Sequence, residues 1–432
     1  MNKLQVLKKR LLSSSLFKDS FWALTGNIFG KGLALLASIL VARMLGKDLY
    51  GMYGLVRTIL LSAAVFTTFG LGFTATKYIA EYVKNSPAKI YDLIRSIMQI
   101  TLTSALIFAI VIFIFSRQIA NYLEAASLYN SIRYLAIIVI FNSITTTQTG
   151  ILAGFKRFKQ VARINLTNGV ATFLLSVGFT NFWGLDGALM ALLISQIIIC
   201  GQFYIEVQRA KRVLGVEKSI EKQSIKKELV IFSFPVAMQE MVYSIHNWVL
   251  PVLLVKLSNF GEVGLYNAAA QWSAVILFIP RTLQNVILSH VSSKAGKLEL
   301  QSKILNRMLL VNLSATFVPC LMVTCFSGLI VKGYGDTFGG LSAVLNFSVY
   351  TTIFMTMSSV IRQYFWAIEK AWFIFGTQII KVFLSFGIFI LLIYLANDDN
   401  GALRMVQAKL ITHFVFFIYL FFMYKKSQRR KS

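Results

Sequence analysis

The chain has 432 residues, of which 56% are hydrophobic and only 14% are charged, and its mean hydropathy is +0.68. A soluble domain carries about a quarter charged residues, so the composition excludes a water-soluble enzyme. The formal net charge of +26 would suit a nucleic-acid-binding protein, but such proteins gather their basic residues on one face of a folded domain. Here the basic residues separate long apolar runs. That arrangement is typical of a polytopic membrane protein with no nucleic-acid partner.

A short basic segment, 1–19, precedes the first apolar run. Leucines at helical spacing accompany a basic group of Lys8, Lys9 and Arg10 in this stretch. We expect residues 1–19 to form a cytoplasmic amphipathic segment on the inner leaflet, and a disordered basic tail is the alternative. The apolar run that follows is too long for a signal peptide and has no convincing cleavage site, so it is interpreted as an uncleaved first span.

Apolar runs of membrane-crossing length recur along the whole chain. A helix needs about 20 apolar residues to cross the hydrocarbon core. Twelve segments meet this requirement, at about residues 20–42, 50–71, 94–116, 134–153, 164–183, 186–206, 229–255, 265–288, 308–331, 344–366, 372–395 and 404–424. When the N-terminus is placed in the cytoplasm, most of the Lys and Arg residues fall in the tails and loops on the cytoplasmic side of the membrane. The positive-inside rule therefore predicts that both termini are cytoplasmic.

An internal repeat divides the chain into two similar halves. The segment 51–53 (GMY) matches 264–266 (GLY), and the segment 154–157 matches 367–370 at the same offset along the chain. Six spans in each half return the chain to the same side, so the repeat is of the parallel type. We expect an N-lobe at 20–208, a cytoplasmic linker at 209–228, a C-lobe at 229–424 and a basic tail at 425–432. The predicted fold class is all-α, with two six-helix lobes.

Ionisable residues inside the predicted spans are the strongest functional signal, because burying a charge in the bilayer is costly. More than two residues inside a span, the cations are Lys31, Arg57, Arg281, Arg362, Lys381 and Lys409, against one acid, Glu240. We interpret Lys31, Arg57, Arg281 and Lys381 as candidates for a cationic cavity that binds an anion such as phosphate. Arg362 and Lys409 lie near span ends, where snorkelling to the interface explains them.

The remaining ionisable residues of the spans carry weaker hypotheses. Glu240 is a candidate for ion coupling or for a salt bridge to a cavity cation. His246 is interpreted as a hydrogen-bonded interior histidine, and His290 and His413 are given no role.

Nothing in the sequence predicts catalysis. The three cysteines, Cys200, Cys320 and Cys325, lie in apolar stretches and form no metal-binding or disulfide pattern. We found no paired carboxylates and no phosphate-cradling motif. We therefore expect no enzyme, no metal and no cofactor. A membrane glycosyltransferase, polymerase or ligase would need a catalytic group in a sizeable loop, and the loops are short. A non-transporting scaffold is disfavoured by the charges within the spans.

Two stretches resemble a known family. Residues 40–53 (LVARMLGKDLYGMY), followed by the turn at 70–72 (GLG) and KYIAEY at 77–82, resemble the start of Wzx-type polysaccharide flippases. These belong to the multidrug/oligosaccharidyl-lipid/polysaccharide (MOP) exporter superfamily. The equivalent motif in the second half is degraded, with Leu257-Ser258-Asn259 where Leu-Gly would be expected.

The resemblance implies a flippase in the bacterial inner membrane that works by alternating access. Its substrate would be an undecaprenyl-diphosphate-linked oligosaccharide for O-antigen of lipopolysaccharide, capsule or exopolysaccharide. A polysaccharide polymerase and a chain-length regulator would be its partners, alongside membrane lipid, and H⁺ or Na⁺ would be the coupling ion. The alternative is a multidrug/cation antiporter of the multidrug and toxic-compound extrusion (MATE) type. Cationic drugs require acids in the cavity, and the spans contain only Glu240.

Overall fold

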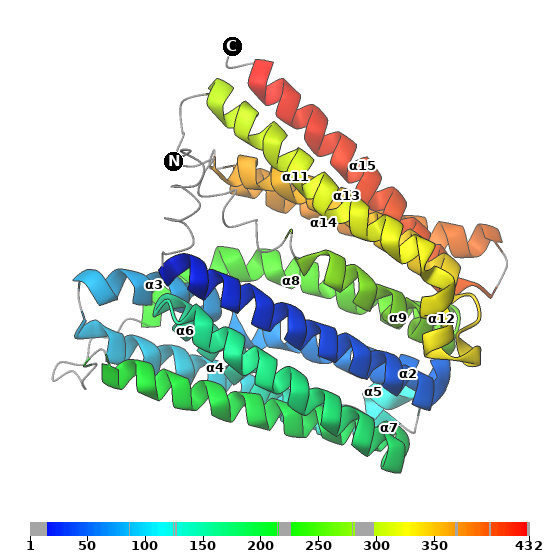
Figure 1. The fold of residues 1–432 in the computed structure, drawn as a ribbon, viewed down its shortest axis with the longest axis horizontal. Helices are drawn as coiled ribbons and strands as arrows, with labels where there is room; N and C mark the ends of the chain where they lie inside the picture. Colours follow the sequence, from blue (N-terminus) through cyan, green and yellow to red (C-terminus); the bar gives the residue numbers. More distant parts are fainter. Residues whose placement is uncertain are drawn as a thin grey trace, which may run out of the picture. The chain divides into compact units, whose positions relative to one another are not determined.

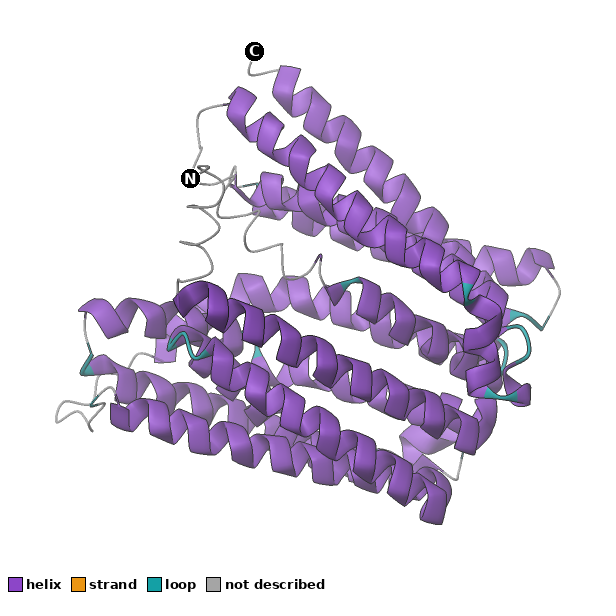
Figure 2. Ribbon diagram, viewed as in Figure 1, coloured by secondary structure: helices purple, strands orange, loops and turns teal. Residues whose placement is uncertain are grey.

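The chain folds entirely into helices over the residues that the structure describes. The structure is a computed structural model that describes residues 15–85, 87–123, 125, 128–213, 215, 226–278, 280, 298–367, 370–396 and 399–429. Figures 1 and 2 show helices joined by short loops, with no strand in these ranges. The α-helices are α2 (Ser15–Thr68), α3 (Leu71–Asn85), α4 (Lys89–Ile114), α5 (Ser116–Tyr122), α6 (Leu128–Gly154), α7 (Phe158–Val213), α8 (Lys226–Leu257), α9 (Phe260–Ile276), α11 (Leu298–Cys325), α12 (Ser327–Tyr334), α13 (Leu341–Ala367), α14 (Ala371–Ala396) and α15 (Gly401–Arg429), and a 3₁₀ turn covers Asp336–Phe338.

Two of these helices are double. α2 has 54 residues and α7 has 56, which at about 1.5 Å per residue is more than twice the thickness of a bilayer core. Gly46 (φ 73°) interrupts α2 and Gly184 (φ 54°) interrupts α7. Glycine adopts positive φ without steric cost. Both breaks fall where the sequence predicts a loop between consecutive spans.

Eight of the described helices are long and apolar enough to cross a membrane, and they include the double helices α2 and α7. The number of twelve spans and the cytoplasmic position of the termini stay predictions. Residues 1–14, most of the linker and residues 430–432 lie outside the described ranges.

The chain forms two compact units. The first comprises Met1–Met44 and Val56–Ser244, and the second comprises Leu45–Leu55 and Ile245–Ser432. The segment around Gly46 is thus part of the second unit, although it lies early in the chain. The lobe boundaries expected from the sequence place this segment in the N-lobe.

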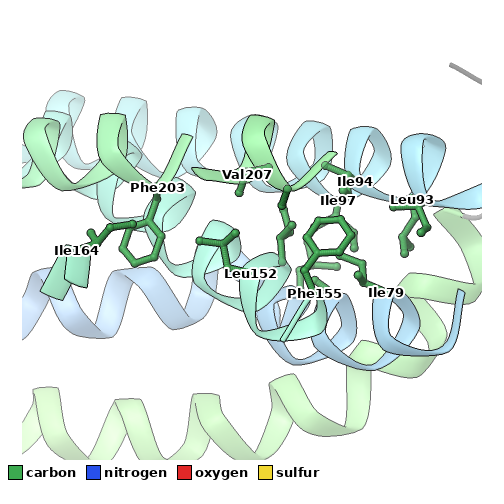
Figure 3. Close-up of a cluster of buried hydrophobic side chains, with 14 of the residues drawn as sticks. Ile79, Leu93, Ile94, Ile97, Leu152, Phe155, Ile164, Phe203 and Val207 are labelled. Atoms are coloured by element: carbon green, nitrogen blue, oxygen red, sulfur yellow. The ribbon is translucent and has the colours of Figure 1, made fainter. Parts of the chain in front are cut away.

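A buried apolar cluster holds the first unit together. Figure 3 shows side chains from α3, α4, α6 and α7 pointing toward one another, among them Ile79, Ile97, Leu152 and Phe203. α3 itself was not expected, because the second predicted span ends near residue 71. Its apolar residues recur every fourth position, at Leu71, Ala75 and Ile79, and are buried. With 15 residues, Lys77 and Glu81 among them, α3 is too short and too charged to register as a membrane-spanning run.

The second unit has its own apolar core, formed mainly by α11, α13, α14 and α15. Its buried members are Leu305, Leu309, Val360, Ile361, Tyr364, Phe365, Ile374, Phe416, Leu420 and Tyr424. The rings of Tyr364 and Tyr424 meet edge to face, with centroids 5.0 Å apart, a favoured arrangement for aromatic pairs.

The repeat-related glycines Gly51 and Gly264 allow two helices of the second unit to touch backbone to backbone. A β-carbon on Gly51 would lie 1.9 Å from the backbone oxygen of Phe260, and one on Gly264 would lie 2.1 Å from the backbone oxygen of Lys47. Lys47 and Phe260 are themselves equivalent positions of the two repeats, as are Gly51 and Gly264. The two contacts are therefore equivalent: in each, a glycine of one repeat touches the same backbone oxygen position of the other repeat.

Neighbouring turns repeat this pattern. A β-carbon on Gly54 would lie 2.1 Å from the side-chain nitrogen of Asn267, and one on Gly261 would lie 2.6 Å from a carboxylate oxygen of Asp48. Each pair again joins equivalent positions of the two repeats. Equivalent positions that meet on successive turns require parallel helices around a local two-fold axis. This geometry confirms the parallel internal repeat.

The degraded motif of the second repeat has a structural reason. Asn259 occupies the position equivalent to Gly46, with extended backbone (φ −159°), and it caps α9 by accepting a hydrogen bond from the Glu262 backbone N–H at 3.0 Å. Glu262 is buried, and its carboxylate accepts a hydrogen bond of 2.7 Å from the backbone N–H of Ala402 at the start of α15. A carboxylate at this position satisfies an orphan donor and complements the helix dipole.

Replacing Glu262 with alanine should destabilise the second unit by about 2 kcal/mol, because the buried Ala402 N–H loses its acceptor. The measurement is the free energy of unfolding in detergent micelles. Glu206→Ala is the matched control. Its carboxylate pairs with the mostly exposed side chain of Arg209 at 2.6 Å, and surface pairs contribute on the order of 0.5 kcal/mol. Equal losses in the two variants would contradict the capping role.

Candidate functional site: a buried basic cluster

Lys381 lies inside the second unit on α14. Only 6% of its surface is exposed. Its ammonium nitrogen lies 5.2 Å from the centroid of the Phe416 ring of α15, a cation–π contact. A lysine this deeply buried is costly unless it meets a partner or a ligand.

Two further cations interact electrostatically with Lys381. They are Arg362 on α13 and Lys409 on α15. Lys409 donates a hydrogen bond to the hydroxyl of Tyr266 on α9 and lies 4.7 Å from the centroid of that ring. Both side chains are half-buried. Sequence reasoning explained them by snorkelling at span ends, and it missed their association with Lys381.

Two histidines complete the group. His413 lies one turn after Lys409 on α15, and His246 lies on α8; they are 5% and 3% exposed. His413 interacts electrostatically with Lys381, Lys409, Arg362 and His246, and His246 interacts with Lys381 and Lys409. We call Arg362, Lys381, Lys409, His246 and His413 the basic cluster.

The histidine rings have unused hydrogen-bonding capacity. The Nε2 atom of His246 and the Nδ1 atom of His413 are buried and have no hydrogen-bond partner among the described residues. The interior position predicted for His246 is confirmed, and the predicted hydrogen bond is not made by this nitrogen. The His246 ring instead packs against Phe386 of α14, with centroids 5.7 Å apart. On the same helix, the Ser385 hydroxyl is also buried without a described partner. Each unsatisfied buried group of this kind requires an explanation, such as a bound ion or water.

The structure does not assign the other predicted site residues to the basic cluster. Lys31 is exposed and Arg57 is half-buried on α2, and Glu240 is half-buried on α8; all three belong to the first unit. Arg281 falls outside the described residues. Of the five residues predicted from the sequence, the structure places Lys381 in the basic cluster. The roles of Lys31, Arg57, Arg281 and Glu240 stay predictions.

A sequence signal for the missed residues did exist. Lys409 and His413 are four positions apart and therefore share a helix face. The whole cluster could not be predicted from the sequence, because α8, α13, α14 and α15 meet only in the folded chain.

The chemistry of the cluster is that of an anion site. It offers ammonium, guanidinium and imidazole donors, all of which suit phosphate or carboxylate oxygens. The described groups whose charge acts on Lys381 are Arg362 and Lys409, and both are cations. The described part of the chain contains no group of three His, Cys, Asp or Glu side chains arranged to hold a metal.

Comparison with known families gives the cluster its context. Residues 16–292 match the family of polysaccharide biosynthesis proteins. The chain belongs to this family. The match covers more than half of the sequence, and it confirms the resemblance drawn from residues 40–53 and 70–82. One relative of this chain is an uncharacterized membrane protein of Methanocaldococcus jannaschii. The two are 19% identical over 290 residues, which cover 64% of this chain and 68% of the relative.

Solved structures establish the fold of this family member. A multidrug resistance MATE family transporter of the MOP superfamily, in an inward-facing conformation, superposes with a TM-score of 0.75 at 14% identity, over 95% of this chain and 99% of the transporter. The lipid II flippase MurJ, in an inward closed conformation, gives 0.73 at 16% identity, over 94% and 87%. A MOP superfamily transporter from Pyrococcus furiosus, described by the reverse polarity of its binding pocket, gives 0.66 at 14% identity, with 98% of each chain covered. The protein is a multi-pass membrane protein with the fold of MOP-superfamily transporters.

Proposed function

We propose that this protein is a flippase that moves undecaprenyl-diphosphate-linked oligosaccharides from the cytoplasmic to the outer face of the bacterial inner membrane by alternating access. The product would serve O-antigen, capsule or exopolysaccharide synthesis. The observation that carries the proposal is a buried basic cluster in a transporter-like fold of the polysaccharide biosynthesis family. A diphosphate headgroup is the anion that such a substrate would present to it.

The sign of the charge separates this function from the alternative. A MATE-type multidrug/cation antiporter would need acidic groups to receive a cationic drug, since a basic site repels it. The overall fold resembles both kinds of protein and does not decide between them. The family match and the basic cluster support the lipid-linked anion. Substrate release to a polymerase and chain-length regulator, and coupling to H⁺ or Na⁺, belong to the same proposal.

The test is mass spectrometry of polyprenyl lipids extracted from cells that lack the gene, with surface glycan assayed in parallel. The proposal predicts accumulated undecaprenyl-diphosphate oligosaccharide and loss of surface polymer, both reversed by the wild-type gene. Unchanged lipids and glycan, combined with increased sensitivity to cationic drugs, would instead establish the antiporter.

Lys31 and Arg57 remain the proposed diphosphate ligands of the first unit. Replacing both with alanine should reduce export in the complemented strain to the level of the deletion, while membrane insertion is retained. Two lost charge-assisted contacts correspond to about 3–6 kcal/mol of binding. Lys332→Ala is the control, because this lysine is exposed on α12 outside the candidate spans. Full export by the double variant would remove these residues from the site.

A further inference from the structure

The histidines of the basic cluster have an unexplained feature. His246 and His413 come from helices that are far apart in the chain, yet both lie close to α14 in the second unit. His246 packs against Phe386 of α14, and His413 shares a face of α15 with Phe416, whose ring contacts Lys381 of α14. Each histidine is more than nine-tenths buried and leaves one ring nitrogen without a described partner. An imidazole that has only a packing role gains nothing from an unsatisfied nitrogen, which costs on the order of 1–3 kcal/mol.

The cations that act on the two rings come from three helices. α14 contributes Lys381 and α15 contributes Lys409, which act on both rings, and α13 contributes Arg362, which acts on His413. Lys409 also donates a hydrogen bond to the hydroxyl of Tyr266 on α9. The described charged neighbours of both rings are therefore all cations.

This arrangement makes histidine protonation depend on the presence of an anion. Adjacent positive charges and burial disfavour the imidazolium form. A phosphate-type dianion within the cluster would reverse the local field and would favour imidazolium, which also donates hydrogen bonds from both nitrogens.

We propose that His246 and His413 are a proton-binding pair that takes up protons when a phosphate or diphosphate anion enters the basic cluster. Anion binding and proton binding are then reciprocally linked: each raises the affinity for the other. The proposal rests on the proposed function only for its biological role, because the linkage itself is a property of the cluster and a phosphate group. Under this proposal, protons bind to the protein together with the substrate.

The composition of the chain permits a direct test, because it contains only three histidines. Protein labelled with ¹⁵N at histidine is purified in detergent micelles, and its ring nitrogens are observed by NMR at about pH 7. His290→Gln removes the third signal, and His246→Gln and His413→Gln assign the other two. Inorganic pyrophosphate is then added, followed in a separate sample by undecaprenyl diphosphate. The proposal predicts that both assigned rings change from neutral to charged on addition of either probe.

Affinity measurements supply the second readout. The pyrophosphate Kd is measured for the wild type and for the His246→Gln/His413→Gln variant between about pH 8 and pH 6. As the pH is lowered, the Kd of the variant divided by that of the wild type should rise. The rise should reach up to about tenfold per pH unit for each linked proton. Lys381→Met should weaken pyrophosphate binding and thereby reduce the histidine response. The probe that acts at the lower concentration identifies whether a lipid headgroup or a free phosphate compound is the natural anion.

Three results would overturn the proposal. The rings would be charged before any anion is added, they would stay neutral although pyrophosphate binds, or neither probe would bind. If a His246 or His413 variant fails to fold, the His290→Gln protein still supplies these outcomes, because its two remaining ring signals belong to His246 and His413. None of them depends on lipid translocation: proton uptake in a protein that flips no lipid would refute the proposed function and support the linkage.

Discussion

Replacing Lys381 with methionine should reduce translocation of lipid-linked oligosaccharide at least tenfold without reducing the stability of the protein. The ammonium group is buried against the Phe416 ring, within electrostatic reach of Arg362, Lys409 and two histidines. Methionine has a similar length and fills the same space against Phe416 without the charge. Because the substitution removes a buried cation from among other cations, it should preserve or increase the free energy of unfolding. A charge-assisted contact to a phosphate oxygen is worth about 1.5–3 kcal/mol, which corresponds to a loss of at least tenfold in binding.

The measurement is the translocation of a labelled lipid diphosphate across the membrane of proteoliposomes, followed by dithionite quenching of the label. The unfolding midpoint is recorded for each variant. Lys425→Met is the matched control, because this lysine is exposed at the end of α15 and its nitrogen lies 5.6 Å from the Phe421 ring. Lys381→Arg retains the charge and should retain part of the activity. Wild-type translocation by the methionine variant would exclude Lys381 from the substrate path, and a large fall in stability would assign it a structural role.

The fold could be predicted from the sequence to the extent that it depends on local properties of the chain. Apolar length predicted the membrane helices, and the positive φ of Gly46 and Gly184 falls at predicted loops. The internal sequence repeat predicted parallel halves, which the contact of Gly51 with the helix of Gly264 confirms. α3 was missed, because this 15-residue helix is shorter than a membrane-spanning run and carries charges within it.

The site was less accessible to sequence reasoning because its residues are joined only by tertiary packing. The depth of a charge along a helix can be estimated from sequence, and this reasoning selected Lys381. Depth says nothing of which neighbouring helix the charge faces, so Arg362 and Lys409 were explained as interfacial and His413 was given no role. In the structure they share one buried group with Lys381. An intramembrane lysine is therefore better interpreted together with other basic residues on neighbouring spans than by its own depth.

Any side chain at Gly51 should disrupt the second unit. In a Gly51→Ala variant the new β-carbon would lie 1.9 Å from the backbone oxygen of Phe260 and 3.0 Å from the backbone nitrogen of Gly264. These are backbone atoms of a packed helix, so no side-chain rotation relieves the overlap, and the two helices must separate. Separation exposes the contact along several turns, and we expect a loss of more than about 4 kcal/mol of stability. The measurement is the unfolding midpoint, together with the monodisperse fraction after detergent extraction.

Gly201→Ala on α7 is the matched control, because a β-carbon at this helical glycine meets nothing within 4 Å. It should leave stability unchanged or raise it by up to about 1 kcal/mol, since alanine is the better helix former. An equal loss in this variant would indicate a general intolerance of glycine substitution rather than a specific contact.

The local two-fold axis makes a sharper prediction for the pair Gly51 and Gly264. Gly264→Ala alone should cost nearly as much as Gly51→Ala, because its β-carbon would lie 2.1 Å from the equivalent backbone oxygen, that of Lys47. The double variant should cost clearly less than the sum of the two. Once the first methyl group has forced the helices apart, the second occupies space that is already open, and residues in direct contact couple in this way. Full additivity of the two free energies would mean that the glycines act independently, and it would contradict the shared backbone contact between these two helices of the second unit.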